Sequence, residues 1–534
     1  MNYKSFKIAG LAVAALLSFG NCTKNFDDIN KNPYGSTDRD LEPDFAIVAA
    51  QLQQAQRSVY LFNPAPSFQL QQNLLGDVFS GYMMSATPFA GNSNNLNYNL
   101  LDGWTSSAFT VGYANVMNPL YKSIQFSKAK QLPDAVGMAE ILRVEAMHRL
   151  SDIYGPIIYT KYNTPNAEGG VDFDSQKDAY YAFFADLKDA IAQLTPFSGK
   201  PASTLFAKAD LVYGGNYTQW LKFANTLRLR LALRIVRIDP AKAQAEGEAA
   251  LADPAGLLTT PGDNFLVDIG STTHPLNVIN DSWDDIRMGA PLESIMNGYS
   301  DPRRPFYVQP ATDPAVVGKY KGIRNGINID AKERYVGYSK LAIFPSKILL
   351  MTSAEAWFLK AEAALRGWAN AGNAQSNYES GIRASFSQYN VGAADNYIND
   401  NTSTPAPYVD PKAITPGSND VLTGSPYLST ITIKWDPAAT FDRNLERIIT
   451  QKWIAMYPEG EEAWSEFRRT GYPKLFPVVI NNSGGKISTT DFVRRATIPS
   501  NEYQTNKAAV DRAIATLSTQ KDVGGTHLWW DPVQ

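Results

Sequence analysis

The pattern that most constrains this chain is an apolar residue at every third or fourth position, repeated in segment after segment. One such segment places Ala139, Leu142, Ala146, Leu150 and Ile153 at these steps and ends at a Gly-Pro pair. The spacing has the period of an α-helix, and glycine followed by proline is typical of a helix end. Repeated over the chain, it predicts a mostly α protein.

The same spacing predicts further helices along most of the sequence. We expect helices over residues 44–61, 67–85, 104–130, 139–154, 176–194, 220–238, 354–368, 445–456 and 461–469. Thr352, followed three residues later by Glu355, resembles a capping box at the start of one of them. No clean 34-residue repeat is present, so the pattern alone does not establish a helical-repeat protein.

Three long tracts between these helices have no helical period. Residues 89–102 are rich in Asn and Gly, residues 253–345 are dense in Pro, Gly and Asp, and residues 391–440 are similar; residues 265–267 form a short extended piece. Loops longer than about 15 residues in a folded protein are typically functional or disordered. We therefore expect helices as a scaffold and aromatic-bearing loops as the working surface.

Composition and charge narrow the classes of partner. Hydrophobic residues make up 44% of the chain and charged residues 19%, which excludes wholesale disorder. The net charge is -3 and the sequence has no dense basic block, which argues against a nucleic-acid partner. Aromatic residues reach 12%, and Tyr and Trp suit sites that must be apolar and hydrogen-bonding at once.

The N-terminus has the pattern of an export signal. Lys4 and Lys7 precede an apolar run over residues 8–19, too short to span a bilayer core that needs about 20 residues. The run leads to Cys22, the only cysteine of the chain, which rules out an internal disulfide. This arrangement resembles a bacterial lipoprotein signal, so we expect a signal peptide over 1–21, a lipid on Cys22 and one mature domain over 22–534. The alternative is an ordinary secretory signal with an incidental cysteine.

The sequence has no persuasive catalytic or metal-binding motif. Its three histidines, His148, His274 and His527, lack zinc-ligand spacing, and a nucleophile elbow, a phosphate-binding loop and an EF-hand spacing are missing. Adjacent carboxylates occur at 284–285 and 461–462, but a glycosidase needs two carboxyls facing each other about 5–9 Å apart. We expect a protein that is no enzyme and needs no cofactor or metal, and we keep a glycan hydrolase as an alternative.

One predicted helix is rich in arginine and allows two interpretations. It carries Arg228, Arg230, Arg234 and Arg237. These side chains could form an anion site, or they could pair with carboxylates between packed helices. The second interpretation is favoured because apolar residues alternate closely with the arginines. A similar packing network is expected of Glu461, Trp464, Arg468 and Arg469, and His148 is expected to be a packed or capping residue.

A series of stretches occurs in the order known from one protein family and covers nearly all of the chain after Cys22. They include NFDDINKNP at 25–33 and ERIITQKWIAMYPEGEEAWSEFRRTGYP at 446–473. The others are residues 141–159, 220–235, 301–303, 351–368, 494–506 and 529–531. With them the chain resembles the SusD/RagB family of nutrient-binding outer-membrane lipoproteins of Bacteroidetes, in particular its starch-associated branch.

The resemblance implies a fold, a location and a partner. The fold is a mostly α, SusD-like one, with tetratricopeptide-like helix pairs as scaffold and long irregular loops with short strands. The protein is expected to be lipid-anchored in the outer membrane, to face the cell exterior, and to deliver an oligosaccharide to a SusC-like TonB-dependent transporter. A peptide ligand and a purely structural role beside the transporter are the alternatives.

The resemblance also directs attention to aromatic residues in the long loops. Sugars present apolar C–H faces and a rim of hydroxyl groups, so their receptors use exposed rings flanked by polar side chains. Two tracts fit this description. The candidate ligand-binding residues are Phe89, Asn97 and Tyr98 in the first tract, and Trp283, Asp284, Arg287 and Met288 in the second. The alternative for each ring is that it folds back onto the body of the protein.

Overall fold

The computed structural model of this protein describes residues 45–59 and 65–532. The predicted signal peptide, Cys22 and the boundary between them lie outside these residues. The chain divides into a unit that ends at Ile47 and a unit from Val48 onward, and the second unit contains every strand and nearly every helix of the described residues. None of the helices in the two described ranges has the length and apolar character needed to cross a membrane.

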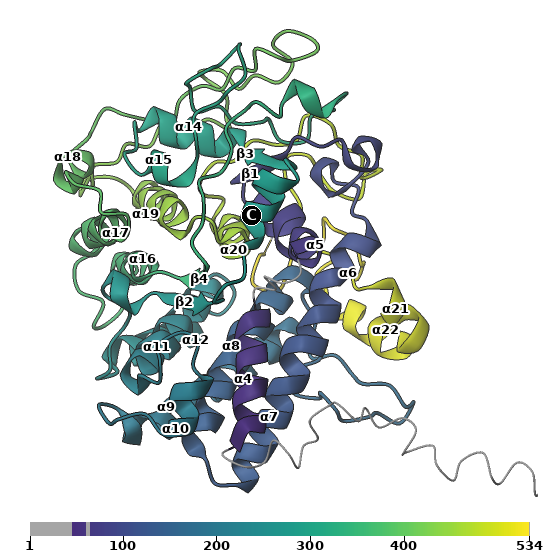
Figure 1. Cartoon of the computed structure of the whole chain (residues 1–534), viewed down its shortest axis with the longest axis vertical. Coiled ribbons are helices and arrows are strands. Elements are labelled where there is room, and N and C mark those ends of the chain that lie inside the picture. Colours follow the sequence, from purple (N-terminus) through teal and green to yellow (C-terminus); the bar gives the residue numbers. More distant parts are fainter. Residues whose placement is uncertain (1–44, 60–64, 533–534) are drawn as a thin grey trace, which may run out of the picture. The chain divides into compact units, whose positions relative to one another are not determined.

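Helices make up most of the regular structure of the described chain, as predicted (Figure 1). In the first half they are α4 (Ala46–Ser58), α5 (Ala65–Phe68), α6 (Asp102–Val111), α7 (Asn118–Ala129), α8 (Pro133–Tyr154), α9 (Gln176–Leu194), α10 (Thr204–Ala209), α11 (Tyr217–Arg234) and α12 (Pro240–Ala252). In the second half they are α13 (Pro275–Asn277), α14 (Ala290–Gly298), α15 (Arg304–Tyr307), α16 (Ser353–Leu365), α17 (Ala374–Gln388), α18 (Ala394–Ile398), α19 (Phe441–Met456), α20 (Gly460–Thr470), α21 (Ser500–Thr505) and α22 (Lys507–Ala515).

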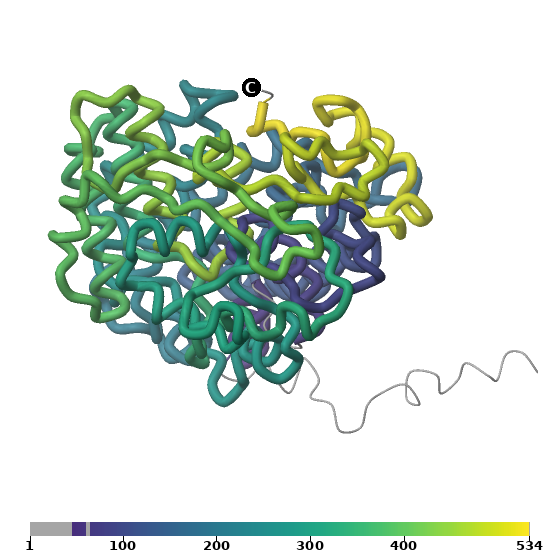
Figure 2. Tube along the Cα trace, turned by 90° about the horizontal axis from the view of Figure 1, so that it is seen from above, coloured from purple at the N-terminus to yellow at the C-terminus, as the bar shows by residue number. Residues whose placement is uncertain are grey.

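The long helices pack as sequence-adjacent pairs, which is the scaffold that the resemblance implied. Helix α8 packs on α9, α11 on α12, and α16 on α17. Helix α8 is buried along nearly all of its length, as expected of a central helix that is covered on every side. The C-terminal segment returns to the first third of the chain (Figure 2), where the backbone N–H and the hydroxyl of Ser500 donate to Asp102 at 2.9 and 2.6 Å.

Four short strands form two antiparallel ribbons. Strand β1 (Met83–Ser85) pairs with β3 (Ile286–Met288), and β2 (Phe265–Asp268) pairs with β4 (Lys347–Met351). The extended piece expected at 265–267 is confirmed. The helix expected over 67–85 is wrong in its last turns, because the helical segment passes through the π-helix η2 (Gln69–Asp77) and ends at Phe79, after which β1 follows. The partner of β1 lies about 200 residues away, so no local pattern indicates this strand.

The helix expected over 104–130 forms, but it contains a wider turn. Helix α6 continues through the π-helix η5 (Gly112–Met117) into α7. π-Helical turns inside α-helices occur frequently at functional sites. The surface beside this π-helical turn is therefore a candidate functional site.

Buried ion pairs join the helices of the scaffold. Arg230 on α11 donates from Nε and Nη2 to the carboxylate of Glu355 on α16, each bond being 2.8 Å long. Arg234, one turn later, donates to Glu462 at 2.5 Å and to Glu466 at 2.8 Å on α20. All five side chains are almost fully shielded from solvent. The packing interpretation of these two arginines is confirmed.

The same network continues into α19 and α20. Arg469 donates to both Glu362 and Glu466 at 2.7 Å, and the ammonium of Lys452 lies 3.2 Å from Glu466. Arg237 differs from the expectation, because it donates to the backbone carbonyl of Arg469 at 3.2 Å and not to a carboxylate.

The residues expected to form a capping box at α16 make only half of it. The hydroxyl of Thr352 accepts a hydrogen bond from the backbone N–H of Glu355 at 2.9 Å. The carboxylate of Glu355 is bound by Arg230, in place of a return bond to Thr352. The ion pair with Arg230 therefore takes the place of the second hydrogen bond of the capping box.

His148 lies inside this network and is packed, as expected. Its ring nitrogens are 3.3 Å from Glu145 and 3.5 Å from Asp152, and all three side chains are fully buried. Burial alone would lower the pKa of His148, but the two carboxylates outweigh it and raise this pKa to about 9. His148 is therefore a cation at neutral pH.

Replacing Arg234 with Met tests the network. The substitution leaves the buried Glu462 without its main partner and removes one of the cations beside Glu466. We expect a loss of about 3–5 kcal/mol in the free energy of unfolding, measured by urea denaturation. Arg383→Met is the matched control, since Arg383 is about half exposed (47%) beside Asp395, and we expect a loss below about 1 kcal/mol. Equal losses in the two variants would contradict a structural role for the network.

The histidines predict how stability changes with pH. Because the pKa of His148 is raised from 6.5 to about 9 in the folded state, its contribution is complete below pH 6.5 and is lost as the pH rises through 9. His527, whose pKa is also raised to about 9 beside Asp491 and Asp531, acts in the same window. We expect unfolding free energies to fall between pH 7 and pH 9, with a shallower slope in His148→Gln. An unchanged slope in that variant would disprove this assignment.

Candidate functional site

The β1–β3 ribbon brings the two predicted ligand tracts to the same end of one structure. Its register pairs Met83 with Met288, Met84 with Arg287 and Ser85 with Ile286. The first tract begins just after Ser85. In the second tract, Trp283 and Asp284 precede Ile286, whereas Arg287 and Met288 lie in β3 itself. Because the strands are antiparallel, Phe89 and Trp283 flank the same end of the ribbon. The sequence identified both tracts but gave no sign that they meet.

Asp285 fastens the two tracts together. Its backbone carbonyl accepts from the hydroxyl of Ser85 at 2.7 Å and from the N–H of Ala86 at 3.0 Å. Its carboxylate accepts from the hydroxyl of Thr87 at 2.6 Å and from the ammonium of Lys332 at 3.2 Å. Lys332 also donates to the carbonyl of Trp283 at 2.5 Å. These bonds fix the backbone on both sides of the ribbon end.

Asp284 remains at the surface and is held as a carboxylate. Its side chain is 39% exposed and accepts from Lys340 at 2.7 Å and from Arg287 at 2.9 Å. Partial burial acts to raise the pKa of Asp284, but the hydrogen bonds from Lys340 and Arg287 outweigh it and lower this pKa below its usual value. The residue therefore offers a fixed negative acceptor.

Three aromatic rings lie half-buried around the ribbon end. Phe89 meets Trp104 of α6 edge to face, with ring centroids 5.8 Å apart and an interplanar angle of 89°. Trp283 is the third ring. Within residues 45–59 and 65–532, the indole N–H groups of Trp104 and Trp283 make no hydrogen bond, so both are free to donate to a ligand. We call Phe89, Trp104, Trp283 and Asp284 the ribbon-end surface.

The backbone around this surface holds several strained residues. Ala90, Asn92 and Asp284 have φ values of 47°, 64° and 54°, in the left-handed region. For an alanine this conformation costs about 1–2 kcal/mol, and such strain is found where the surroundings hold a functional loop in place. Asn92 supplies part of that hold, because its side chain exchanges two 3.0 Å hydrogen bonds with the backbone of Ile329.

The asparagines of the first tract bind the protein itself. Asn95 donates to the carbonyl of Leu74 at 3.2 Å, and Asn97 donates to the carbonyl of Gly326 at 3.1 Å. Asn97 is 1% exposed. These amides anchor the loop, so a ligand at this surface would meet rings and a carboxylate more than it meets amide groups.

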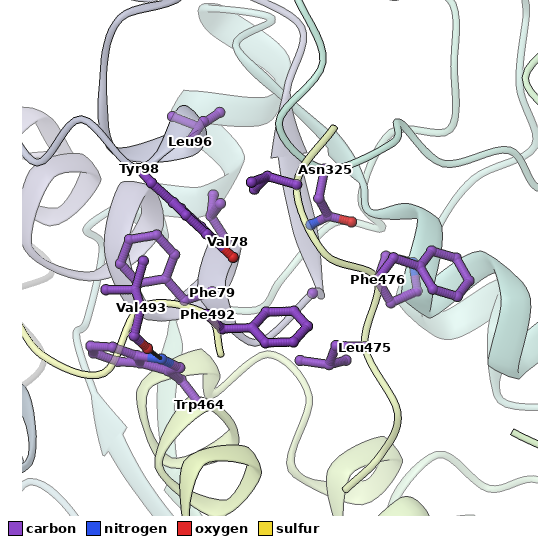
Figure 3. A pocket seen from close by; sticks show the side chains of 13 residues that line it. Val78, Phe79, Leu96, Tyr98, Asn325, Trp464, Leu475, Phe476, Phe492 and Val493 are labelled. Atoms are coloured by element: carbon purple, nitrogen blue, oxygen red, sulfur yellow. Dashed lines mark hydrogen bonds between the residues drawn. The ribbon is translucent and has the colours of Figure 1, made fainter. Parts of the chain in front are cut away.

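Tyr98 points inward, away from the ribbon-end surface. Its side chain is 4% exposed and lines a cavity of about 20 Å³ with Trp464, Phe492 and Asn325 (Figure 3). That volume suits about one water molecule and is too small for a sugar. Burial raises the pKa of the Tyr98 hydroxyl well above its usual value. Tyr98 therefore belongs to the core in this structure.

Arg287 and Met288 are also interior residues, with no exposed side-chain surface. The guanidinium of Arg287 donates to the carbonyl of Val336 at 2.7 Å, to its neighbour Ile286 at 2.6 Å and to Asp284. Arg287 thus positions Asp284. The guanidinium N–H groups in these bonds all point at protein atoms and not at solvent. Of the predicted residues, Phe89, Trp283 and Asp284 are the ones that a ligand can reach.

Trp104 and Lys332 belong to the site but were not predicted. Trp104 was expected to open a helix, and it does so as part of α6. No sequence signal relates Lys332 to Trp283 across 49 residues. A tryptophan in the first turn of a predicted helix, directly after an aromatic-bearing loop, is a signal that could have identified Trp104.

The other candidate chemistries are absent from the described residues. No group of three or more His, Cys, Asp or Glu side chains lies close enough to hold a metal ion in residues 45–59 and 65–532. The adjacent carboxylates Glu461 and Glu462 are buried and engaged with Arg149, Arg234 and Arg468. They do not face each other across a cleft.

A helical scaffold that presents half-buried rings on fixed loops is compatible with a ligand-binding protein, and comparisons with known proteins identify the family. Residues 28–531 match the SusD-like family model, described as Susd and RagB outer membrane lipoprotein. Among solved structures, a chitin-binding SusD homolog from Flavobacterium johnsoniae is 42% identical, with a TM-score of 0.86, over 91% of this chain and 99% of that one. A SusD homolog from Bacteroides vulgatus is 34% identical, with a TM-score of 0.85, over 92% and 99%. No curated protein matches the sequence.

This chain belongs to the SusD/RagB family of outer-membrane lipoproteins. The predicted fold and location are confirmed at that level. SusD-like proteins bind their ligands without catalysis, so the chain is a binding protein and no hydrolase.

Proposed function

We propose that this lipoprotein captures an oligosaccharide at the cell surface and delivers it to a SusC-like TonB-dependent transporter. The observation that carries the proposal is the ribbon-end surface, where the strand register brings the Phe89–Trp104 ring pair to the same end of the ribbon as Trp283 and the fixed carboxylate of Asp284. Rings pack on the C–H faces of sugars, and Asp284 with the two indole N–H groups can bind hydroxyls. The helices behind the surface hold these groups in place before a ligand arrives.

Oligosaccharides of the chitin class are our first choice of ligand. The support is the 42% identity to a chitin-binding homolog over nearly the whole length of both chains. Starch fragments are the alternative that the sequence resemblance suggested, and a peptide is the second. The rings of the ribbon-end surface serve any of these ligands, since one fold supports several specificities.

Replacing both Phe89 and Trp283 with Ala tests the site. We expect the affinity for chitin oligosaccharides to fall at least about tenfold, which corresponds to about 1.4 kcal/mol of binding free energy, because two stacking faces are lost. Isothermal titration calorimetry with the soluble mature chain measures the effect. Phe126→Ala is the control, since Phe126 is a half-buried ring on α7 outside this surface.

Three ligands decide the specificity in the same experiment. Chitin oligosaccharides, malto-oligosaccharides and a mixed peptide library are titrated in turn into the unsubstituted chain. If only the malto-oligosaccharides bind, starch fragments become the proposed ligand in place of chitin. If only peptides bind, a peptide becomes the proposed ligand in place of a sugar. Unchanged affinity in the double variant would remove the ribbon-end surface from the proposal.

The lipid anchor on Cys22 and the transporter partner form the second part of the proposal. Cys22 lies outside the described residues, and its role rests on the signal-like sequence before it and on the family. We expect Cys22→Ser to move the protein from the membrane fraction to the soluble fraction. We also expect the unsubstituted, tagged protein to co-purify from detergent with a TonB-dependent barrel. A membrane-bound Cys22→Ser variant, or recovery without a barrel, would refute the corresponding part.

A further inference from the structure

A second surface carries the chemistry of a sugar site, and it shares none of its residues with the ribbon-end surface. It is a groove of about 600 Å³ beside α6, η5 and α21, which we call the tyrosine groove. Its lining includes Phe109, Tyr113, Asn118, Tyr162, Asn163 and Glu502.

The rings of the groove form a continuous group. Tyr113 and Tyr162 are nearly parallel, at 9°, with centroids 6.2 Å apart. The ring centroids of Phe109 and Tyr113 are 4.7 Å apart, and those of Tyr121 and Tyr162 are 5.5 Å apart in an edge-to-face arrangement. Tyr113, Tyr121 and Tyr162 are half-buried and Phe109 is buried. The group thus presents apolar ring surface at the edge of the protein, as the C–H face of a sugar requires.

The position of these rings is fixed without a ligand. The hydroxyl of Tyr113 accepts a hydrogen bond from the backbone N–H of Ile158 at 2.7 Å. Asn163 has a left-handed backbone, with φ at 59°, and its amide donates to the hydroxyl of Tyr121 at 3.3 Å. Tyr162 lies between these two anchored points, so little conformational entropy is lost when a ligand packs on its ring.

Polar groups line the groove beside the rings. The side chains of Thr110, Asn118 and Asn501 all contribute to its wall. In the described ranges 45–59 and 65–532, these three side chains form no hydrogen bond with the protein. Their hydroxyl and amide groups are therefore free for the hydroxyl groups of a sugar.

The carboxyl group of Glu502 adds a hydrogen-bond acceptor that has no cationic partner among the described residues. The structure pairs it with no basic side chain anywhere in the part of the chain that it describes. Partial burial raises the pKa of Glu502 above its usual value, and a hydrogen bond from Asn506 offsets this only in part. A ligand with a neutral N–H group can donate a hydrogen bond to the carboxyl group of Glu502, whereas an anionic sugar would be repelled by it. The acetamido group of an N-acetylated amino sugar is such a donor.

The two surfaces lie on one continuous helical segment. Trp104 belongs to α6, and Tyr113 follows nine residues later in η5, which corresponds to roughly 14 Å of helical rise. Nine residues are about two and a half turns of an α-helix, so the side chains of Trp104 and Tyr113 leave it on roughly opposite faces. We therefore expect each surface to bind a glycan on its own.

We propose that the tyrosine groove is a second, separate glycan-binding site, selective for neutral N-acetylated sugars. This inference rests on the proposed function, because it assumes that the chain binds oligosaccharides. It assigns Tyr162 as the stacking residue and Glu502 as the acceptor for the acetamido N–H.

Calorimetry with diacetylchitobiose, which is short enough to occupy one site at a time, tests the inference. We expect two binding events per unsubstituted chain, one in Tyr162→Ala, one in Phe89→Ala with Trp283→Ala, and none when the three substitutions are combined. Glu502→Gln is a second groove variant that keeps the shape of the side chain, and we expect it to weaken the groove event at least about tenfold. Phe126→Ala is the control and should retain both events.

The outcomes separate this inference from the proposed function. A single event that is lost with Phe89 and Trp283 and is unaffected by Tyr162→Ala and Glu502→Gln would overturn the groove and leave the proposed function intact. No binding of any glycan by the unsubstituted chain would overturn both.

Discussion

Buried charge is the constraint on which this structure depends. Arg230, Arg234 and Arg469 pair with carboxylates of α16 and α20 in the buried interior. Removing charges from water costs several kcal/mol each, and the cost is recovered only when the geometry of the pairs is good. The helices must therefore meet at one register, because a shifted helix would leave a charge without its partner. Apolar packing alone tolerates more variation than this network does.

The rigidity of the scaffold explains how loops can form a binding surface. The tract before β3 is held by Asp285, and the tract after β1 is held by asparagine side chains that bind the backbone elsewhere. Few residues therefore face the ligand, and a larger number of residues hold those few in position. A preorganised surface loses less entropy on binding, which suits weak and shallow contacts with sugars.

The sequence predicted most of the scaffold and part of the site. Helical periodicity located α9 at its observed ends, and the alternation of arginine with apolar residues indicated the ion pairs of Arg230 and Arg234. Strand β1 could not be predicted, because its partner is distant and three residues carry no period. Tyr98 and Asn97 have the composition of a sugar site, yet both are buried. Burial of a loop residue depends on segments such as Gly326, which no local pattern relates to the loop.

The pairing of β1 with β3 has a consequence for how the surface comes into being during folding. The two strands are separated by about 200 residues, and closing so long a segment is costly in chain entropy and slow compared with forming local helices. A nascent chain can thus complete helices such as α8 and α9 while Phe89 and Trp283 are still far apart. Competence to hold a ligand is acquired late, once the middle third of the polypeptide has joined the earlier helices.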